Sequence, residues 1–323
     1  MEHYLDNAAT TKPCAEAAAA VMSCISSHYG NPSSLHRKGL EAQHEVEYAR
    51  NQVAGALGCK AQEIVFTSGA TESTNLALCG AAAAYGRKRK KIITSAVEHA
   101  SVRETMAHLE TLGFTVVSVP PAEDGLYHAE DFLKEVDKDT CMVSIMLVNN
   151  ENGYRMPVEE VFRTVKRRDP DIITHCDAVQ GFLKVSFKPR TLCADLVSLS
   201  GHKVHALKGA GALYIRQGVR LKSVLYGSRQ EKGLRPGTEG VPVIAAFGAA
   251  AEKLVLTMDE RYDAVSGLRS SLIEQLKEMD GVIIRDLPSA SPYVLNISLL
   301  GYRSEIVLHY LEQREVYISS GSA

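Results

Sequence analysis

Residues 91–120 read KIITSAVEHASVRETMAHLETLGFTVVSVP, and this stretch decides the fold class. The apolar run KIITSAV (91–97) has the composition of a buried strand, and FTVVSVP (114–120) has the same character. The segment between them, ASVRETMAHLETLG (100–113), has the pattern of a helix that ends at Gly113. The stretch therefore predicts a β-α-β unit.

The same alternation continues on both sides of this unit. A helix is predicted from Gly39 to Leu57, where apolar residues recur at helical spacing and Gly58 follows, and another is predicted over 157–168. Strands alternating with helices predict an α/β fold with a largely parallel sheet covered on both faces, whose functional loops lie at the carboxyl ends of the strands. Further strands are predicted over 63–67, 140–148, 171–178, 194–200 and 211–216.

The character of the sequence changes after Pro242, where two long helices are predicted within 243–279. We therefore expect a large domain over residues 15–242 and a smaller α+β domain that combines residues 1–14 with 243–323. The small domain ends on a strand and an unfinished glycine turn. We expect that its C-terminal part is missing and that the chain is a piece of a longer protein.

Composition and charge exclude several classes of protein. Of the 323 residues, 45% are hydrophobic and 23% are charged, which is the composition of a globular protein with a large core. The formal net charge of −2, with acidic and basic residues intermixed, gives no reason to expect nucleic acid binding. The sequence shows neither a membrane-spanning apolar run nor a signal-peptide pattern at its start. We expect a cytoplasmic protein that binds neither nucleic acid nor membranes.

The cysteines give no sign of a metal site. They are scattered, odd in number, and include no CxxC pair of the kind that zinc and iron–sulfur sites use. We expect reduced and mostly buried thiols. The seven are Cys14, Cys24, Cys59, Cys79, Cys141, Cys176 and Cys193.

A candidate anion site lies in the turn SGAT (68–71), between a predicted strand and a helix that begins near Glu72. Backbone N–H groups at a helix N-terminus and small hydroxyl side chains suit a single phosphate. A plain strand-to-helix turn with a serine or threonine cap has the same pattern, so both interpretations stay open. The absence of a Walker lysine in this turn disfavours a nucleoside triphosphate loop.

A candidate reactive lysine, Lys203, lies in the turn SGHK (200–203), directly after a predicted strand. A lysine fixed in an interior loop loses its proton on desolvation and can form a Schiff base. A lysine on a surface turn stays a hydrated ammonium, and for a lone lysine this is the commoner case. The apolar strands on both sides and the nearby glycines favour the interior position here.

Three further side chains follow predicted strands and are candidates for the same site. Asp177 ends a strand, where its carboxylate would hold a protonated pyridine nitrogen or, alternatively, cap a helix. Gln180 lies three residues on, within reach of a phenolic oxygen on such a ring. His99 is placed to stack on the ring and move protons near neutral pH, although a histidine at a strand end more often has a structural role.

Together these segments resemble the class V aminotransferase group of pyridoxal phosphate (PLP) enzymes, and most closely the cysteine desulfurases of the NifS/IscS type. The resemblance implies PLP fold-type I, the aspartate aminotransferase-like fold, and conversion of L-cysteine to L-alanine. The segments that carry it cover nearly the whole chain in order: LDNAATT, GNPSSLH, EIVFTSGATES, SAVEHASV, VSIMLVNNENG, HCDAVQ, VSLSGHKVHALKGAGALYI, LRPGTEG and SSGSA.

The resemblance also implies roles for individual positions. Lys203 would bind PLP covalently and, with His99, act in catalysis. Asp177 would hold the ring nitrogen, and Gln180 and Asn150 would contact the ring oxygen. Because one phosphate ligand comes from the neighbouring subunit in this family, a homodimer is implied. The phosphate ligands would be Ala70, Thr71, Ser200, His202 and, from that subunit, Thr238.

The sulfur-handling residue is expected outside this sequence. In the family, a cysteine on a mobile loop takes the sulfur as a persulfide, and it directly follows the alanine that matches Ala323. None of the cysteines present lies at a matching position. We therefore expect this cysteine just after Ala323 and a sulfur-acceptor protein as a partner, with iron–sulfur assembly, tRNA thiolation or another pathway as the destination.

Two other functions stay open from the sequence. Selenocysteine lyase, or another class V PLP enzyme, would use the same lysine and aspartate. A catalytically inert PLP-binding dimeric scaffold is the alternative if the chain ends at Ala323.

Overall fold

The structure, a computed structural model, describes residues 1–321 and is built around a mixed sheet. Within these residues the sheet has seven strands in the spatial order β2-β8-β7-β6-β5-β3-β4. β8 runs antiparallel to both of its neighbours, and the other pairs are parallel, so the expected α/β fold with a largely parallel sheet is confirmed. The strands are β2 (Ile64–Thr67), β3 (Lys91–Ser95), β4 (Thr115–Val119), β5 (Thr140–Met146), β6 (Ile173–Asp177), β7 (Leu196–Ser200) and β8 (Gly211–Ile215).

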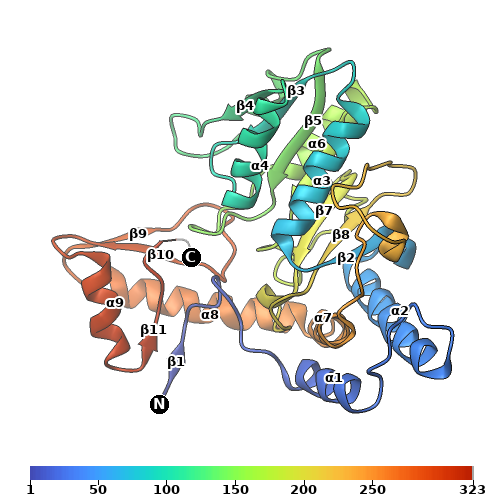
Figure 1. Cartoon of the computed structure of the whole chain (residues 1–323). Coiled ribbons are helices and arrows are strands. Elements are labelled where there is room, and N and C mark those ends of the chain that lie inside the picture. The colour runs from blue at the N-terminus through green and yellow to red at the C-terminus, as the bar shows by residue number, and fades with distance from the viewer. Residues whose placement is uncertain (322–323) are drawn as a thin grey trace.

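Helices cover both faces of the sheet (Figure 1). On one face, α3 and α4 form a core with strand residues such as Ile92. On the other face, Ile93 and its neighbours pack against residues of α1, α2, α5, α6 and α7. Ile92 and Ile93 point to opposite faces, as alternation along a strand requires. These helices are α1 (Ala15–Ser26), α2 (Arg37–Leu57), α3 (Ala70–Tyr85), α4 (Ala100–Thr111), α5 (Ala129–Leu133), α6 (Val158–Arg168) and α7 (Val241–Val255).

The chain after α7 forms a second unit that includes the N-terminal residues. β1 pairs in parallel with β11, so segments from near the two ends of the sequence lie side by side (Figure 1). β9 and β10 form an antiparallel pair. Ser322 and Ala323, which close the SSGSA segment, and the cysteine expected after them lie outside the described residues. The elements are β1 (His3–Tyr4), α8 (Met258–Lys277), β9 (Val282–Arg285), β10 (Asn296–Leu299), α9 (Ser304–Glu312) and β11 (Val316–Tyr317).

Helix α7 packs with the large unit, although the expected domain boundary at Pro242 assigns it to the small one. Its residues Ile244, Phe247 and Ala251 share a core with the sheet, and the helix packs on α1 and α2. We propose a boundary near Leu256, at the 74° bend between α7 and α8. No single helix in the described chain has both the length and the hydropathy of a membrane span. Helices α7 and α8 meet these criteria only when they are taken together, and the pair is bent.

A buried glutamate ties the end of β3 to the end of β5. The Glu98 Oε1 atom accepts hydrogen bonds from Ser95 Oγ at 2.6 Å and from the Met146 backbone N–H at 2.9 Å. Burial raises the pKa of Glu98 to about 8, and the nearby charge of Asp177 acts in the same direction. Glu98 is therefore a neutral acid at pH 7, and it fixes the turn that carries His99.

Replacement of Glu98 by glutamine should remove a pH dependence of folding stability. The folded-state pKa of Glu98 lies above its unfolded value of 4.5, so its contribution to stability is complete below pH 4.5 and is lost as the pH rises toward 8. The free energy of unfolding of Glu98→Gln minus that of the wild type should be larger at pH 8.5 than at pH 5, by on the order of 4 kcal/mol. Urea unfolding at the two pH values measures the difference. A gap that does not change with pH would contradict the buried neutral acid.

Candidate active site

Lys203 lies in the short 3-10 turn Gly201–Lys203 that follows β7, against the N-terminal segment of the chain. Its Nζ donates to the backbone carbonyls of Ala8 and Ala9, each at 2.6 Å. The same segment is held in place by Thr11, whose N–H and hydroxyl both donate to the His202 carbonyl at 2.9 Å. Lys203 is therefore partly buried rather than on an open surface turn. Burial lowers its pKa, while Asp6 and Asp177 act in the opposite direction.

Asp177 is the last residue of β6 and only 5% exposed. Its Oδ1 accepts the backbone N–H of Val179 at 3.0 Å. Strand register places Asp177 opposite Met146 on β5 and Ser198 on β7. Burial raises the pKa of Asp177, and the Val179 N–H, His99 and Lys203 oppose this shift. A buried carboxylate of this kind is stabilised by any cation that meets it, and a protonated ring nitrogen is one.

His99 is the N-cap residue of α4, which is a structural role, and this role is compatible with proton transfer by the same side chain. Its Nδ1 accepts the Ser101 backbone N–H at 3.1 Å, which fixes the ring and places the proton of the neutral imidazole on Nε2. Nε2 has no hydrogen-bond partner within residues 1–321 and is free to exchange a proton. The cap thus orients the imidazole without using the nitrogen that chemistry requires.

The first turn of α3 has the features of an anion site. Gly69, its N-cap, offers no side-chain cap, so the N–H groups of Ala70 and Thr71 stay available. Gly211 packs so close that a Cβ there would lie 2.6 Å from the Gly69 backbone, which brings β8 against this turn. Ser200 lies opposite Gly211, and its buried hydroxyl has no partner in the described chain.

His202 completes this region as a neutral side chain. Its Nδ1 lies 3.2 Å from Thr10 Oγ1, and burial together with the charges of Lys203 and Lys208 lowers its pKa to about 4. The orphaned Ser200 hydroxyl, the free helix N–H groups and the buried Asp177 fit the phosphate and the ring nitrogen of PLP.

Gln180 and Asn150 are placed differently from each other. Gln180 Nε2 donates to the Ala8 carbonyl at 2.8 Å, so it shares an acceptor with Lys203, and its Oε1 accepts from Lys184 at 2.9 Å. The Asn150 side chain makes no hydrogen bond within the described residues and is free for a ligand. Its neighbour Asn149 is structural, because its Oδ1 accepts two backbone N–H groups of the following turn.

Thr238 lies in the loop that precedes α7. It is exposed, and its side chain makes no hydrogen bond within residues 1–321. The loop that carries it is nevertheless anchored beside the anion site, because Arg235 Nε donates to Glu72 Oε1 at 2.9 Å. A buried ion pair between Arg50 and Glu231 fixes the start of the same loop.

Two contacts of this site have no signal in the sequence. The carbonyls of Ala8 and Ala9 bind Lys203 through the backbone, which leaves no side-chain pattern. Lys184 lies four residues after Gln180 and donates to it, yet nothing in the sequence around it differs from that of an ordinary surface lysine. In the structure it is 6% exposed.

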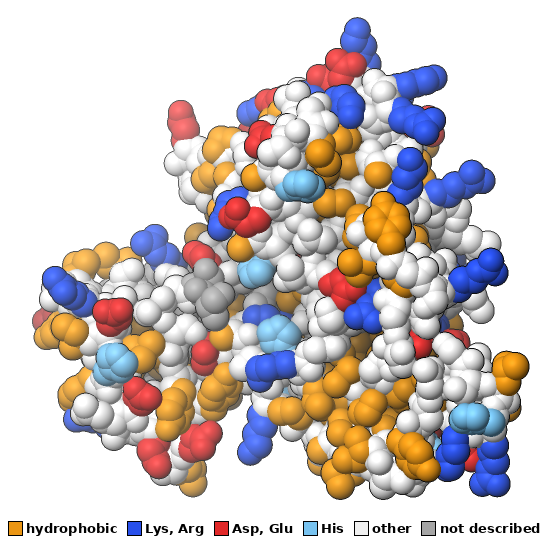
Figure 2. Space-filling model, in the orientation of Figure 1, with side chains coloured by type: hydrophobic (Ala, Val, Ile, Leu, Met, Phe, Trp, Pro, Cys, Tyr) orange, Lys and Arg blue, Asp and Glu red, His pale blue; other side chains and the backbone are white. Residues whose placement is uncertain are grey.

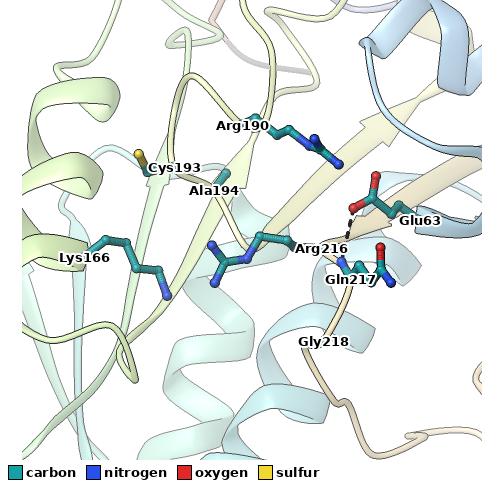
Figure 3. A pocket seen from close by; sticks show the side chains of 8 residues that line it. All are labelled: Glu63, Lys166, Arg190, Cys193, Ala194, Arg216, Gln217 and Gly218. Carbon is teal, nitrogen blue, oxygen red and sulfur yellow. Dashed lines mark hydrogen bonds between the residues drawn. The ribbon is translucent and has the colours of Figure 1, made fainter.

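A separate cavity of about 600 Å³ lies at the opposite edge of the sheet (Figure 3). Lys166 and Arg216 line it, but both pair with Asp195, which precedes β7, whereas Lys203 follows that strand. Lys166 also donates to the carbonyls of Pro170 and Ile172, so its donors are occupied. This cavity is therefore not part of the Lys203 site.

Comparison with known proteins agrees with the motifs. The sequence pattern of the aminotransferase class-V family matches residues 3–323. A cysteine desulfurase IscS of Dictyoglomus turgidum is 39% identical over 324 residues, which cover 100% of this chain and 82% of that protein. A NifS/IcsS protein homolog of Lactobacillus delbrueckii subsp. bulgaricus is 41% identical over 323 residues, which cover 99% of this chain and 84% of that protein.

Solved structures show the same relationship. A NifS-like protein that is 39% identical superposes with a TM-score of 0.95, over 99% of this chain and 88% of its own. SspA in complex with cysteine is 32% identical and superposes with a TM-score of 0.83, over 99% of this chain and 90% of its own. The resemblance to NifS/IscS proteins and the PLP fold-type I architecture are thereby confirmed, and this chain belongs to the aminotransferase class-V family.

Proposed function

We propose that this protein is a PLP-dependent cysteine desulfurase, which removes the sulfur of L-cysteine and leaves L-alanine. The observation that carries the proposal is that a partly buried amine, Lys203, and a buried carboxylate, Asp177, both lie at the carboxyl ends of the sheet strands and influence each other's pKa. Relatives named cysteine desulfurase, of which the chain covers 82% and 80%, support the reaction. A similar structure in complex with cysteine supports the substrate.

The residues of the site divide the work of this reaction. When bound, PLP supplies an aldehyde for an amine to attack and a ring that draws electrons from the substrate carbon. Lys203 Nζ leaves the carbonyls of Ala8 and Ala9, holds the cofactor, and later moves a proton at the substrate. Asp177 keeps a proton on the ring nitrogen. His99 Nε2 exchanges a second proton with the substrate, while its Nδ1 stays bound in the α4 cap.

The phosphate in this proposal binds to the first turn of α3 and the end of β7. Ala70 and Thr71 contribute N–H groups, and Ser200 contributes a hydroxyl that otherwise lacks a partner. Gly211 on β8 leaves no room for a side chain of its own against the Gly69 backbone, so the strand lies close to the turn. Asn150 and Gln180 are the candidates for the ring oxygen.

Three of the cysteines within the described chain are poor candidates for the sulfur acceptor. Burial raises the pKa of the Cys24 and Cys141 thiols to about 11 and that of Cys59 to about 12. Thiols with such pKa values carry little thiolate at neutral pH, and the thiolate is the nucleophile. We therefore propose that a cysteine following Ala323 accepts the sulfur and that a separate protein then receives it. Iron–sulfur cluster assembly as the destination and a cytoplasmic location stay predictions.

A homodimer is part of the proposal. Hydrophobic side chains gather over α1 on the face shown in Figure 2. Met22, Ile25, Tyr29 and Leu35, on α1 and the loop after it, are between 53% and 94% exposed. Monomeric proteins rarely expose contiguous apolar patches of this kind. The exposed Thr238 is then available to the phosphate site of a second copy.

The function is tested with the complete gene product loaded with PLP. Given L-cysteine and a reductant, it should form L-alanine and sulfide in equal amounts. Lys203→Ala should lose the visible absorbance of bound PLP and lower the rate of alanine formation at least about a thousandfold, because both attachment and proton transfer are removed.

The matched control for this variant is Lys208→Ala, because Lys208 is an exposed lysine five residues along the same loop. It should keep both the absorbance and the rate. Unchanged absorbance in Lys203→Ala would refute the lysine assignment, and a wild-type protein that forms no alanine would refute the reaction.

The dimer predicts that Thr238→Ala weakens PLP binding although the Thr238 side chain makes no hydrogen bond within residues 1–321. Loss of one hydrogen bond to a charged phosphate should raise the Kd for PLP by about tenfold. Absorbance titration measures the Kd, and Thr191→Ala, which alters an exposed threonine at the other edge of the sheet, is the control. A sedimentation experiment that finds a fully active monomer would contradict the shared site.

A further inference from the structure

Lys184 is a buried lysine without a counterion. Its side chain is 6% exposed, and no carboxylate lies within 4.0 Å of its Nζ in residues 1–321. Nζ donates to Gln180 Oε1 at 2.9 Å and lies 6.0 Å from the centre of the Tyr293 ring. Lysines are almost never buried in this way unless they are paired, because an isolated ammonium loses its hydration. A position of this cost calls for a functional explanation.

The backbone turns Lys184 inward at some cost. Leu183, directly before it, has a φ of 57°, in the left-handed region that a branched side chain rarely adopts. The turn is held by the Lys184 N–H, which donates to the Gly181 carbonyl at 3.1 Å. The inward position of Lys184 therefore comes with a strained backbone at the residue before it.

A continuous chain of hydrogen bonds connects Lys184 to Lys203. Lys184 Nζ donates to Gln180 Oε1, Gln180 Nε2 donates to the Ala8 carbonyl at 2.8 Å, and Lys203 Nζ donates to the same carbonyl at 2.6 Å. An ammonium can only donate and a carbonyl can only accept. The two ends therefore determine which way the Gln180 amide faces, with its oxygen toward Lys184 and its N–H groups toward Lys203.

The charges around Lys184 are mainly positive. Burial lowers its pKa to about 7, and Lys203 and Arg261 add to this shift. Carboxylates near this group act on Lys203 rather than on Lys184. The positive charge of Lys203 therefore disfavours a proton on Lys184. The titratable and charged groups that surround the two amines are His202, His205, Arg261, Tyr293, Asp6 and Asp177.

We propose that Lys184 is a positioning residue of the active site, which holds the Gln180 amide in one orientation through its hydrogen bond to Gln180 Oε1. Lys184 touches neither substrate nor cofactor in this role. The consequence for catalysis rests on the proposed function.

The outcomes separate a positioning role from a structural one. Lys184→Met removes an unpaired buried charge, so it should be at least as stable to urea as the wild type. Lys184→Arg keeps a donor for Gln180 Oε1, so it should keep the wild-type Kd for PLP, and a Kd that does not change in Lys184→Met would overturn the proposal. Failure of the wild-type protein to take up PLP would refute the proposed function instead.

Orientation of the amide is tested by a double-mutant cycle on the Kd for PLP. If Lys184 acts through Gln180, then Lys184→Met should weaken PLP binding in the wild-type background and have no further effect in Gln180→Ala. Additive effects of the two substitutions would show that Lys184 acts independently of the amide.

Discussion

Unpaired burial of ionisable side chains at the carboxyl ends of β3, β6 and β7 is the constraint on which this site depends. Asp177, Glu98, Lys203 and Lys184 are each withdrawn from water, and within residues 1–321 none has an oppositely charged side chain within 4.0 Å. Elsewhere this chain buries charge in pairs, as at Arg50 with Glu231. The contrast marks this edge of the sheet as a place where the fold accepts a cost in stability.

The fold can tolerate the unfavourable burial of these groups because hydrogen-bonded strands hold the loops that carry them. Parallel register brings Met146, Asp177 and Ser198 side by side, so the loops that follow these strands meet at one edge. Glu98 then ties the β3 loop to β5. The N-terminal segment closes the other side by offering carbonyls to Lys203. A ligand that brings a cation to the carboxylate and an anion to the α3 turn recovers part of this cost, which links cofactor binding to folding stability.

Most of the framework could be predicted from the sequence, because strand and helix periods are local properties. The unit over 91–120 and the helix stop at Gly58, which has a φ of 73°, are present as predicted. Helix α1 was visible only as an alanine-rich piece, and the two-residue strand β1 depends on a partner more than 300 positions away. Contacts of Lys203 with backbone carbonyls, and the inward turn of Lys184, depend on three-dimensional packing. Thr238 depends on a second copy of the chain, so no pattern within one sequence fixes its contacts.

The two like-charged pairs in the site act in a common way. Burial keeps Glu98 neutral, and the charge of nearby Asp177 acts in the same direction, while Asp177 accepts the Val179 N–H and the fields of nearby cations. Lys184 stands in the same relation to Lys203, because burial and the charge of Lys203 both disfavour a proton on Lys184. In each pair the supporting member is the one whose charge is suppressed, so the reactive member has no fully charged neighbour of its own sign beside it. A site built in this way sets the charge of its groups first by withdrawal from water and then by the neighbours that stay charged.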